Sequence, residues 1–236
     1  MVSKNQNGWL ALVATPIGNL EDITLRARRF LEEADIIAAE DTRRTRKLCS
    51  HFDIHTSLIS YHAHNEHKKT PEILDKVVEG QRIAVVTDAG TPGISDPGFL
   101  IVREALKRDI EPIIVPGPSS LTFAVLASGF PVDQFTFLGY PPRKTGQRRR
   151  FFEQLVGQET TFFIFASVHR IDRVLEDIAD VLGPRTRIAV IREATKVHEE
   201  RLRGAVEDVI VEKQGQKWRG EFVIALDMRN SPVPEK

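Results

Sequence analysis

Short apolar runs alternate with longer segments of helical period along the first half of this 236-residue chain. The apolar runs are residues 10–14, 34–39, 57–61, 83–87 and 111–115. Each run is followed by a stretch that can be helical: residues 25–33, 42–50, 71–79, 97–108 and 119–128. Parallel strands need crossover connections, which helices usually supply. The alternation therefore predicts βα units stacked on a largely parallel sheet, an α/β fold.

Two prolines indicate where helices begin. Thr70 followed by Pro71 predicts an N-cap and a first helical residue, and Gly80 is a fitting stop for that helix. Asp96 followed by Pro97 predicts the same kind of start for the next helix.

The pattern changes after Gly129. Strands, the first two rich in phenylalanine, are predicted at residues 134–139, 161–166, 187–192 and 221–227, with helices near 148–156 and 171–182. The change indicates a domain boundary between residues 116 and 130. We therefore expect two α/β domains, residues 1–117 and 118–236.

Charge and cysteine content narrow the class of partner and the compartment. Lysine plus arginine equals aspartate plus glutamate, at 33 each, so no whole-molecule field attracts nucleic acid or an anionic membrane. A nucleic acid would need a local basic patch, and candidates are residues 43–47, 143–144 and 148–150.

Cys49 is the only cysteine, which excludes an internal disulfide. No apolar run approaches the roughly 20 residues that span a bilayer, and none near Met1 resembles a signal peptide, so we expect a cytoplasmic protein without a membrane partner.

Three glycine- and proline-rich turns follow predicted strands. They are ATPIGNL (14–20), the long TDAGTPGISDPG (87–98) and VPGPSSL (115–121). If the strands are parallel, all three turns lie on one edge of the sheet, where open α/β sheets bind ligands. The alternative is that each is an ordinary tight turn with a helix cap.

Residue types and motifs that are absent from these turns limit the class of ligand that they can bind. The chain contains no Gly-Lys pair and no Gly-x-Gly, so a P-loop and a dinucleotide fingerprint are both absent. The turns carry no lysine or arginine but contain Asp88 and Asp96. This composition suits a neutral or cationic ligand better than a polyphosphate, while free helix N-termini can still bind a carboxylate.

Four motifs together resemble a known family: TPIGNLEDIT (15–24), AAEDTRRT (38–45), TDAGTPGISDPG (87–98) and REATK (192–196). They are similar to the tetrapyrrole methylase superfamily and, within it, to the bacterial 16S rRNA (cytidine 2′-O)-methyltransferase family, over residues 12–225. The resemblance implies two α/β domains with S-adenosylmethionine in the cleft between them, and a homodimer. It also implies methylation of the ribose 2′-hydroxyl of a decoding-region cytidine in 16S rRNA, with the small ribosomal subunit of the cytoplasm as the expected substrate.

The resemblance also implies which residues line the cofactor site. Carried over by motif, these are Pro16, Gly18, Asn19, Asp88, Gly90, Thr91, Pro92, Ser95, Asp96, Gly117 and Ser119, with Ser167 of ASVHR (166–170) from the second domain. The sequence departs mildly from the family pattern at Thr87 and Tyr140, where serine and phenylalanine are more usual. The first domain is expected to face the RNA and the second to complete the cofactor site.

The catalytic candidates are Asp41, Arg43 and Lys196. A ribose hydroxyl is a weak nucleophile, so it must be aligned with the methyl group and lose its proton. AAEDTRRT (38–45) leaves a strand at the same sheet edge and is expected to place Glu40, Asp41 and Arg43 at the mouth of the cleft. Asp41 is the candidate for the base in this motif, although it could instead be the N-cap of the next helix. Lys196 could lower the effective pKa of the hydroxyl or hold a phosphate, and the alternative is a solvated surface lysine.

Other readings stay open at this stage. His62, His64 and His67 could form a metal site if the first two lie on a strand, but no cysteine partners them and we expect no metal. A small-molecule, tetrapyrrole-like methyltransferase on the same fold is the alternative function. A non-catalytic module that binds the cofactor as an effector is a third.

Overall fold

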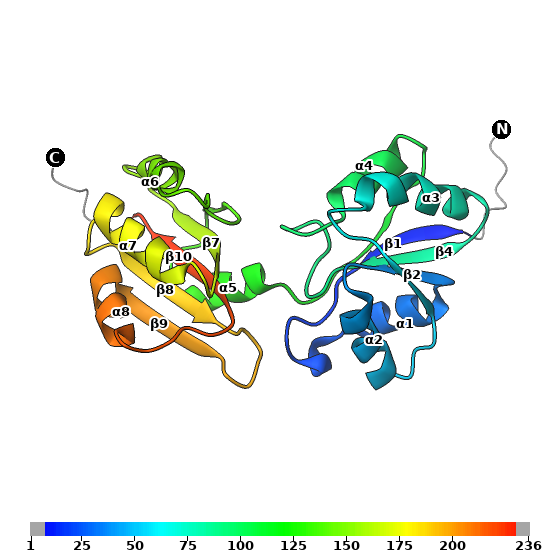
Figure 1. The fold of residues 1–236 in the computed structure, drawn as a ribbon, viewed down its shortest axis with the longest axis horizontal. Helices are drawn as coiled ribbons and strands as arrows, with labels where there is room; N and C mark the ends of the chain where they lie inside the picture. The colour runs from blue at the N-terminus through cyan, green and yellow to red at the C-terminus, as the bar shows by residue number, and fades with distance from the viewer. Residues whose placement is uncertain (1–7, 230–236) are drawn as a thin grey trace. The chain divides into compact units, whose positions relative to one another are not determined.

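The computed structural model describes residues 8–229, and the chain divides into two compact units, Met1–Ser119 and Ser120–Lys236. The first unit contains β1 (Trp9–Val13), a short 3-10 turn η1 (Leu20–Asp22), α1 (Leu25–Glu33), β2 (Ile36–Ala39), α2 (Thr42–His51), β3 (Ser57–Ser60), α3 (Glu66–Val78), β4 (Arg82–Val86), α4 (Phe99–Leu106) and β5 (Ile113–Val115). Its five-stranded sheet has the order β3-β2-β4-β1-β5, and every pairing is parallel (Figure 1). The predicted parallel sheet is therefore confirmed.

Both faces of this sheet are covered, as a parallel sheet requires. One apolar cluster joins the strands to α1 and α2 and includes Leu31, Leu48 and the buried Cys49. A second cluster, on the other face, joins them to α3 and α4. Burial raises the pKa of the Cys49 thiol, so this cysteine serves as a small core residue rather than a nucleophile.

The second unit is a mixed α/β layer. It contains α5 (Ser120–Ser128), β6 (Phe135–Phe137), α6 (Thr145–Glu153), β7 (Thr161–Ser167), α7 (Ile171–Leu182), β8 (Arg187–Arg192), β9 (Glu200–Ala205), α8 (Val206–Lys213) and β10 (Glu221–Asp227). The sheet order is β6-β7-β10-β8-β9, with β6 and β7 parallel and the remaining pairs antiparallel. Strand β9 and helix α8 were not predicted from the sequence. The predicted class of two α/β domains is confirmed.

Both predicted proline starts are wrong. Helix α3 begins at Glu66, and Thr70 lies inside it, buried, with its hydroxyl 3.0 Å from the hydroxyl of Tyr61. Helix α4 begins at Phe99 because Gly98, in its N-cap position, has a φ of 145°, which no helix continues. Asp96 and Pro97 therefore belong to the preceding turn.

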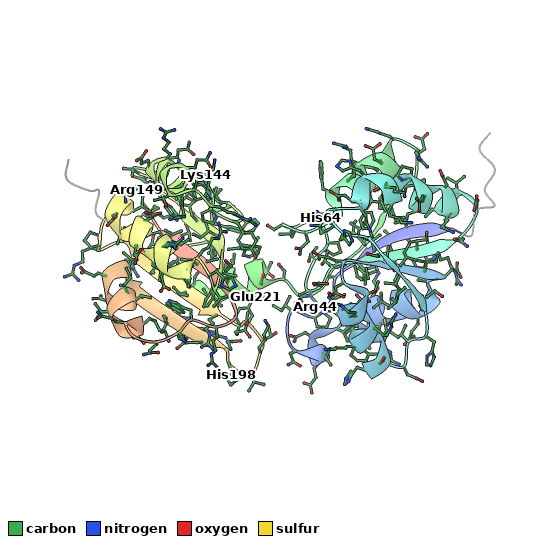
Figure 2. The ribbon with its side chains drawn as sticks, in the orientation of Figure 1. Arg44, His64, Lys144, Arg149, His198 and Glu221 are labelled. Carbon is green, nitrogen blue, oxygen red and sulfur yellow. The ribbon has the colours of Figure 1, made fainter. Side chains whose placement is uncertain are left out.

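The arginine run at 148–150 is largely a structural anchor rather than a free basic patch. The Arg148 side chain is buried, and its Nε donates to Asp177 of α7 at 2.6 Å. Arg149, labelled in Figure 2, donates to Asp180 at 2.8 Å. Within this run only Arg150 is both exposed and outside the network. The run thus joins α6 to α7, and most of its charge is already neutralised.

Within residues 8–229, no helix has the length and apolar character needed to cross a membrane.

Candidate functional site

The carboxyl ends of the parallel strands bring the three predicted turns of the first unit together. Thr15 and Gly90 exchange two backbone hydrogen bonds of 3.0 Å, which joins the turn after β1 to the turn after β4. The Thr15 hydroxyl donates to the Thr87 carbonyl at 3.3 Å. A Cβ on Gly117 would lie 3.0 Å from the Cβ of Ala14, so the turn after β5 packs against the first.

Gly90 lies where all three turns meet. Its φ is +81°, and an added Cβ would lie 3.3 Å from Ile17 and 3.7 Å from the carbonyl of Pro118. The three turns meet because β4, β1 and β5 are neighbouring parallel strands, so the turns that follow them leave the same edge of the sheet. Glycine is required here both by its backbone conformation and by the close approach of the neighbouring turns.

The long turn, residues 87–98, folds back on itself. The Gly93 amide donates to the Pro97 carbonyl at 3.1 Å, and Ser95 has a φ of +65°. Pro92 is buried, Thr91 is half-buried and Asp96 is exposed. Backbone held in sparsely populated conformations clusters at ligand-binding sites, which is consistent with the predicted role of this turn.

The other predicted cofactor residues of this unit occupy the first and third turns. Pro16 is buried, whereas Gly18 and Asn19 are exposed. The Asn19 side chain accepts the amide of Glu21 at 3.1 Å and thereby caps η1. Ser119 is half-buried at the end of the unit. That these residues bind the cofactor stays a prediction.

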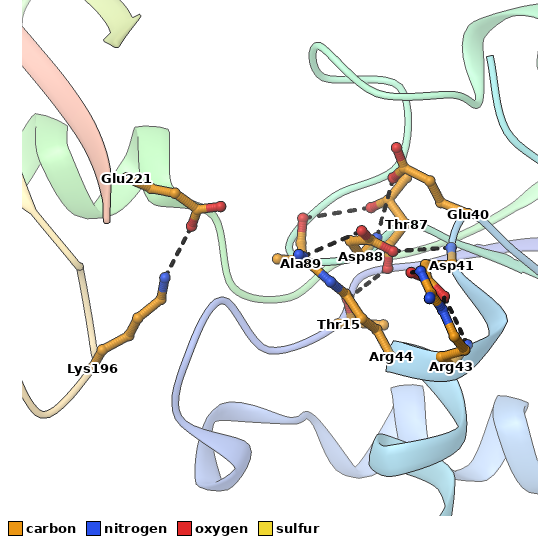
Figure 3. A network of polar contacts seen from close by, with 10 residues as sticks. All are labelled: Thr15, Glu40, Asp41, Arg43, Arg44, Thr87, Asp88, Ala89, Lys196 and Glu221. Carbon is orange, nitrogen blue, oxygen red and sulfur yellow. Dashed lines mark hydrogen bonds and ion pairs between the residues drawn. The ribbon is translucent and has the colours of Figure 1, made fainter. Parts of the chain in front are cut away.

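A polar network follows β2 at the same sheet edge (Figure 3). Asp41 is the N-cap of α2 and accepts three donors of Arg43: the amide at 2.8 Å, Nε at 3.1 Å and Nη2 at 2.7 Å. These hydrogen bonds hold the pKa of Asp41 far below its usual range. The N-cap alternative for Asp41 is thus observed, and a carboxylate held so firmly ionised is a poor proton acceptor.

Asp88 connects this network to the long turn. Its Oδ1 accepts the Asp41 amide at 3.0 Å, and Arg44 lies 3.3 Å from its Oδ2. The turns contain no cation of their own, but the tertiary structure supplies one from α2. The backbone amide of Asp88 in turn donates to Glu40 Oε2 at 3.3 Å.

In the second unit, Lys196 is held by two carboxylates. Its Nζ lies 2.8 Å from Glu193. The same Nζ lies 3.0 Å from Glu221, the contact drawn in Figure 3. Burial disfavours the ammonium, but these two hydrogen bonds outweigh burial and raise the pKa of Lys196 above its ordinary value. Lys196 is therefore a fixed cation and not a freely solvated lysine. Among the residues that the structure describes, two of its three N–H donors are used, which leaves one for a ligand.

The segment that carries Lys196 has a strained backbone. Glu193 and Thr195 have positive φ values of 49° and 67°. The Glu193 carboxylate also accepts the Glu221 amide at 3.0 Å, and it lies so close to Gly220 that a Cβ there would collide with it. Ser167 on β7 is paired in register with Glu221 on β10. Glu221 is therefore next to both predicted site residues of this unit, Ser167 and Lys196.

Sequence reasoning missed three supporting residues. Glu193 lies in the REATK motif, three residues before Lys196, and this spacing could have indicated that the two side chains pair. Glu221 and Gly220 lie at the start of the last strand, where nothing local indicates a partner for Lys196.

The histidine segment is a turn rather than a strand. Strand β3 ends at Ser60, and the His62 amide donates to Asn65 Oδ1 at 2.9 Å just before α3. The rings of His62 and His64 lie 5.9 Å apart at their centroids. No group of three metal-ligating side chains occurs among the residues that the structure describes. The assumed strand geometry is wrong, and the expectation of no metal stays a prediction.

Comparison with known proteins places this chain. Residues 10–210 match the model of the family described as Tetrapyrrole (Corrin/Porphyrin) Methylases. The chain is 44% identical over 234 residues to a ribosomal RNA small subunit methyltransferase I of Halalkalibacterium halodurans, covering 99% of this chain and 81% of that protein. It is 44% identical over 219 residues to the protein of the same name from Thermotoga maritima, covering 93% and 98% of the two chains.

Solved structures agree on the fold. Uroporphyrin-III C-methyltransferase from Thermus thermophilus, solved in complex with S-adenosyl homocysteine, superposes with a TM-score of 0.63 at 19% identity, covering 92% of this chain and 97% of that one. With the family model matching most of its length, this chain belongs to the tetrapyrrole (corrin/porphyrin) methylase family.

Proposed function

We propose that this protein transfers a methyl group from S-adenosylmethionine to the ribose 2′-hydroxyl of a cytidine in the decoding region of 16S rRNA. The observation that carries the proposal is the 44% identity along 99% of the chain to a protein named as a small-subunit rRNA methyltransferase. The substrate is the assembled small ribosomal subunit, the enzyme is cytoplasmic, and it acts as a homodimer.

The residues of the three turns fit this cofactor. They present glycine backbone at positive φ and two carboxylates, Asp88 and Asp96, with no lysine or arginine of their own. Arg44 of α2 lies 3.3 Å from Asp88 and offsets its charge, and the lack of lysine and arginine within the turns disfavours a polyphosphate. When bound, the cofactor supplies an electrophilic methyl group on a sulfonium sulfur. The residues of the turns would hold it.

Helix α2 supports an RNA-facing role for the first unit. Arg43, Arg44, Arg46 and Lys47 are all exposed on it. Arg43 is fixed at its base by Asp41 but has 84% of its side chain exposed, so it can still meet a phosphate. Each such contact contributes affinity that falls as salt rises.

The proposal is tested by methyl transfer to small subunits that lack the modification. We expect label from S-adenosylmethionine on the ribose of a decoding-region cytidine, located by nuclease mapping. Assembled subunits should be better substrates than naked RNA, because the neutral chain provides only local basic contacts. Absence of transfer from a preparation that binds the cofactor tightly would contradict the RNA substrate and favour a small-molecule acceptor.

Lys196→Ala is expected to lower kcat/KM for methyl transfer by about 10- to 100-fold, the worth of one charge-assisted hydrogen bond. The reason is that its ammonium, positioned by Glu193 and Glu221, has one donor left for the RNA or for the reacting oxygen. The measurement is steady-state kinetics on small subunits. Lys107→Ala, which removes an exposed ion pair to Glu104 on α4, is the matched control and should leave the rate unchanged. Equal rates for the two variants would remove Lys196 from the site.

A further inference from the structure

Three carboxylates gather at the sheet edge after β2 and β4, and two of them are already neutralised. Asp41 is bound by Arg43 through two guanidinium nitrogens, Nε and Nη2, and through the backbone amide. Asp88 faces Arg44 and also accepts the amide of Asp41. Asp41 is poorly placed to accept a proton, because its hydrogen bonds with Arg43 hold its pKa far below the usual range.

Glu40 differs from both. It is half-buried, and with the described residues its carboxylate makes one hydrogen bond, in which Oε2 accepts the Asp88 amide at 3.3 Å. Among those residues no lysine or arginine forms an ion pair with it. In Figure 3 its carboxylate lies on the side of Asp88 away from Arg43.

The groups around Glu40 come from three elements. Asp88 follows β4, Arg44 lies on α2, and His62 follows β3. Burial raises the pKa of Glu40, and the negative charge of Asp88 adds to the rise. The Asp88 amide, Arg44 and His62 oppose it without cancelling it. The Nδ1 of His62 is itself buried and has no hydrogen-bond partner among the described residues.

We infer that Glu40, and not Asp41, accepts the proton of the ribose hydroxyl in the methyl transfer. The inference rests on the proposed function and names the general base within it. The geometry that carries it is a half-buried carboxylate with which no lysine or arginine of the described residues forms an ion pair, on the sheet edge where the three turns converge. A base works best when its pKa is brought toward the working pH.

The proton of the 2′-hydroxyl passes to the Glu40 carboxylate as the ribose oxygen forms a bond to the methyl carbon. The bond between that carbon and sulfur breaks, and its electron pair stays on sulfur, which becomes a neutral thioether. Glu40 then releases the proton to solvent.

The test is single-turnover methyl transfer by Glu40→Gln, compared with Asp41→Asn and the parent enzyme. We expect Glu40→Gln to slow the step by about 10²- to 10⁴-fold, the usual worth of a general base. Asp41→Asn should lose less, because asparagine also caps a helix. The parent rate should rise with pH through a pKa above the ordinary 4.5 of glutamate, and Glu40→Asp should shift that rise.

Two readouts separate a catalytic role from a structural one. Cofactor affinity by calorimetry and the melting temperature should be unchanged in Glu40→Gln, and carbon-13 NMR titration should give Glu40 a raised pKa in the free protein. Glu32→Gln, which removes an exposed carboxylate paired to Arg28, is the matched control. A Glu40→Gln rate equal to that of the parent, or a larger loss in Asp41→Asn, would overturn the inference. If the parent itself fails to methylate subunits, it is the proposed function that fails.

Discussion

Asp177→Ala is expected to destabilise the second unit by about 3–5 kcal/mol, the cost of leaving a buried charge without its partner. Arg148 is 2% exposed and Asp177 is 5% exposed, and their side chains are 2.6 Å apart. Removing the carboxylate leaves a guanidinium between α6 and α7 whose one remaining acceptor within residues 8–229 is the Arg143 carbonyl, at 3.1 Å. Desolvation of that charge is then uncompensated.

Urea unfolding followed by Trp218 fluorescence measures this loss, in a Trp9→Phe background that leaves one tryptophan, in the second unit. The matched control is Asp180→Ala, because Asp180 pairs with the neighbouring Arg149 at 2.8 Å but is 59% exposed. An exposed pair of this kind contributes at most about 1 kcal/mol. The double variant Arg148→Met with Asp177→Leu should recover most of the stability. Equal midpoints for Asp177→Ala and Asp180→Ala would show that the buried pair has no special role.

Gly98→Ala is expected to lower the affinity for S-adenosylmethionine at least about tenfold, or 1.4 kcal/mol. Gly98 has a φ of 145° and a ψ of −34°, a conformation that alanine rarely adopts. An added Cβ would lie 2.8 Å from the backbone nitrogen of Gly93 and 3.1 Å from the carbonyl carbon of Pro92. These are backbone atoms, so the long turn itself would have to move.

Calorimetric titration with the cofactor measures the effect, and methyl transfer should fall in parallel. Gly129→Ala is the matched control: its φ is +72°, yet a Cβ there meets nothing within 4 Å. It should cost about 1 kcal/mol in stability and leave cofactor affinity intact. Cofactor binding by Gly98→Ala at the parental affinity would contradict the assignment of residues 87–98 to the cofactor site.

Local sequence patterns predicted the secondary structure correctly where one segment of the chain is enough to determine it. Alternation of apolar runs and helical segments predicted the five parallel strands of the first unit, since strand and helix periods are read within about ten residues. They failed where a local signal competes with packing. Thr70 resembles an N-cap, but it bonds Tyr61 in the core instead, and Asp96 precedes a proline that remains in the turn.

The candidate site divides in the same way. Sequence by itself determined the α/β class, the three turns and the motifs that carry the family resemblance, because glycine, proline and strand periodicity act on the backbone nearby. Only the tertiary structure decided which charges meet: Arg44 with Asp88, Lys196 with Glu221 and Arg148 with Asp177. It also left Glu40 without an ion pair to any lysine or arginine of the described residues, while Arg43 pairs with Asp41. The physical reason is that these pairings depend on strand order and helix packing between residues 25 to 44 positions apart, which no local pattern encodes.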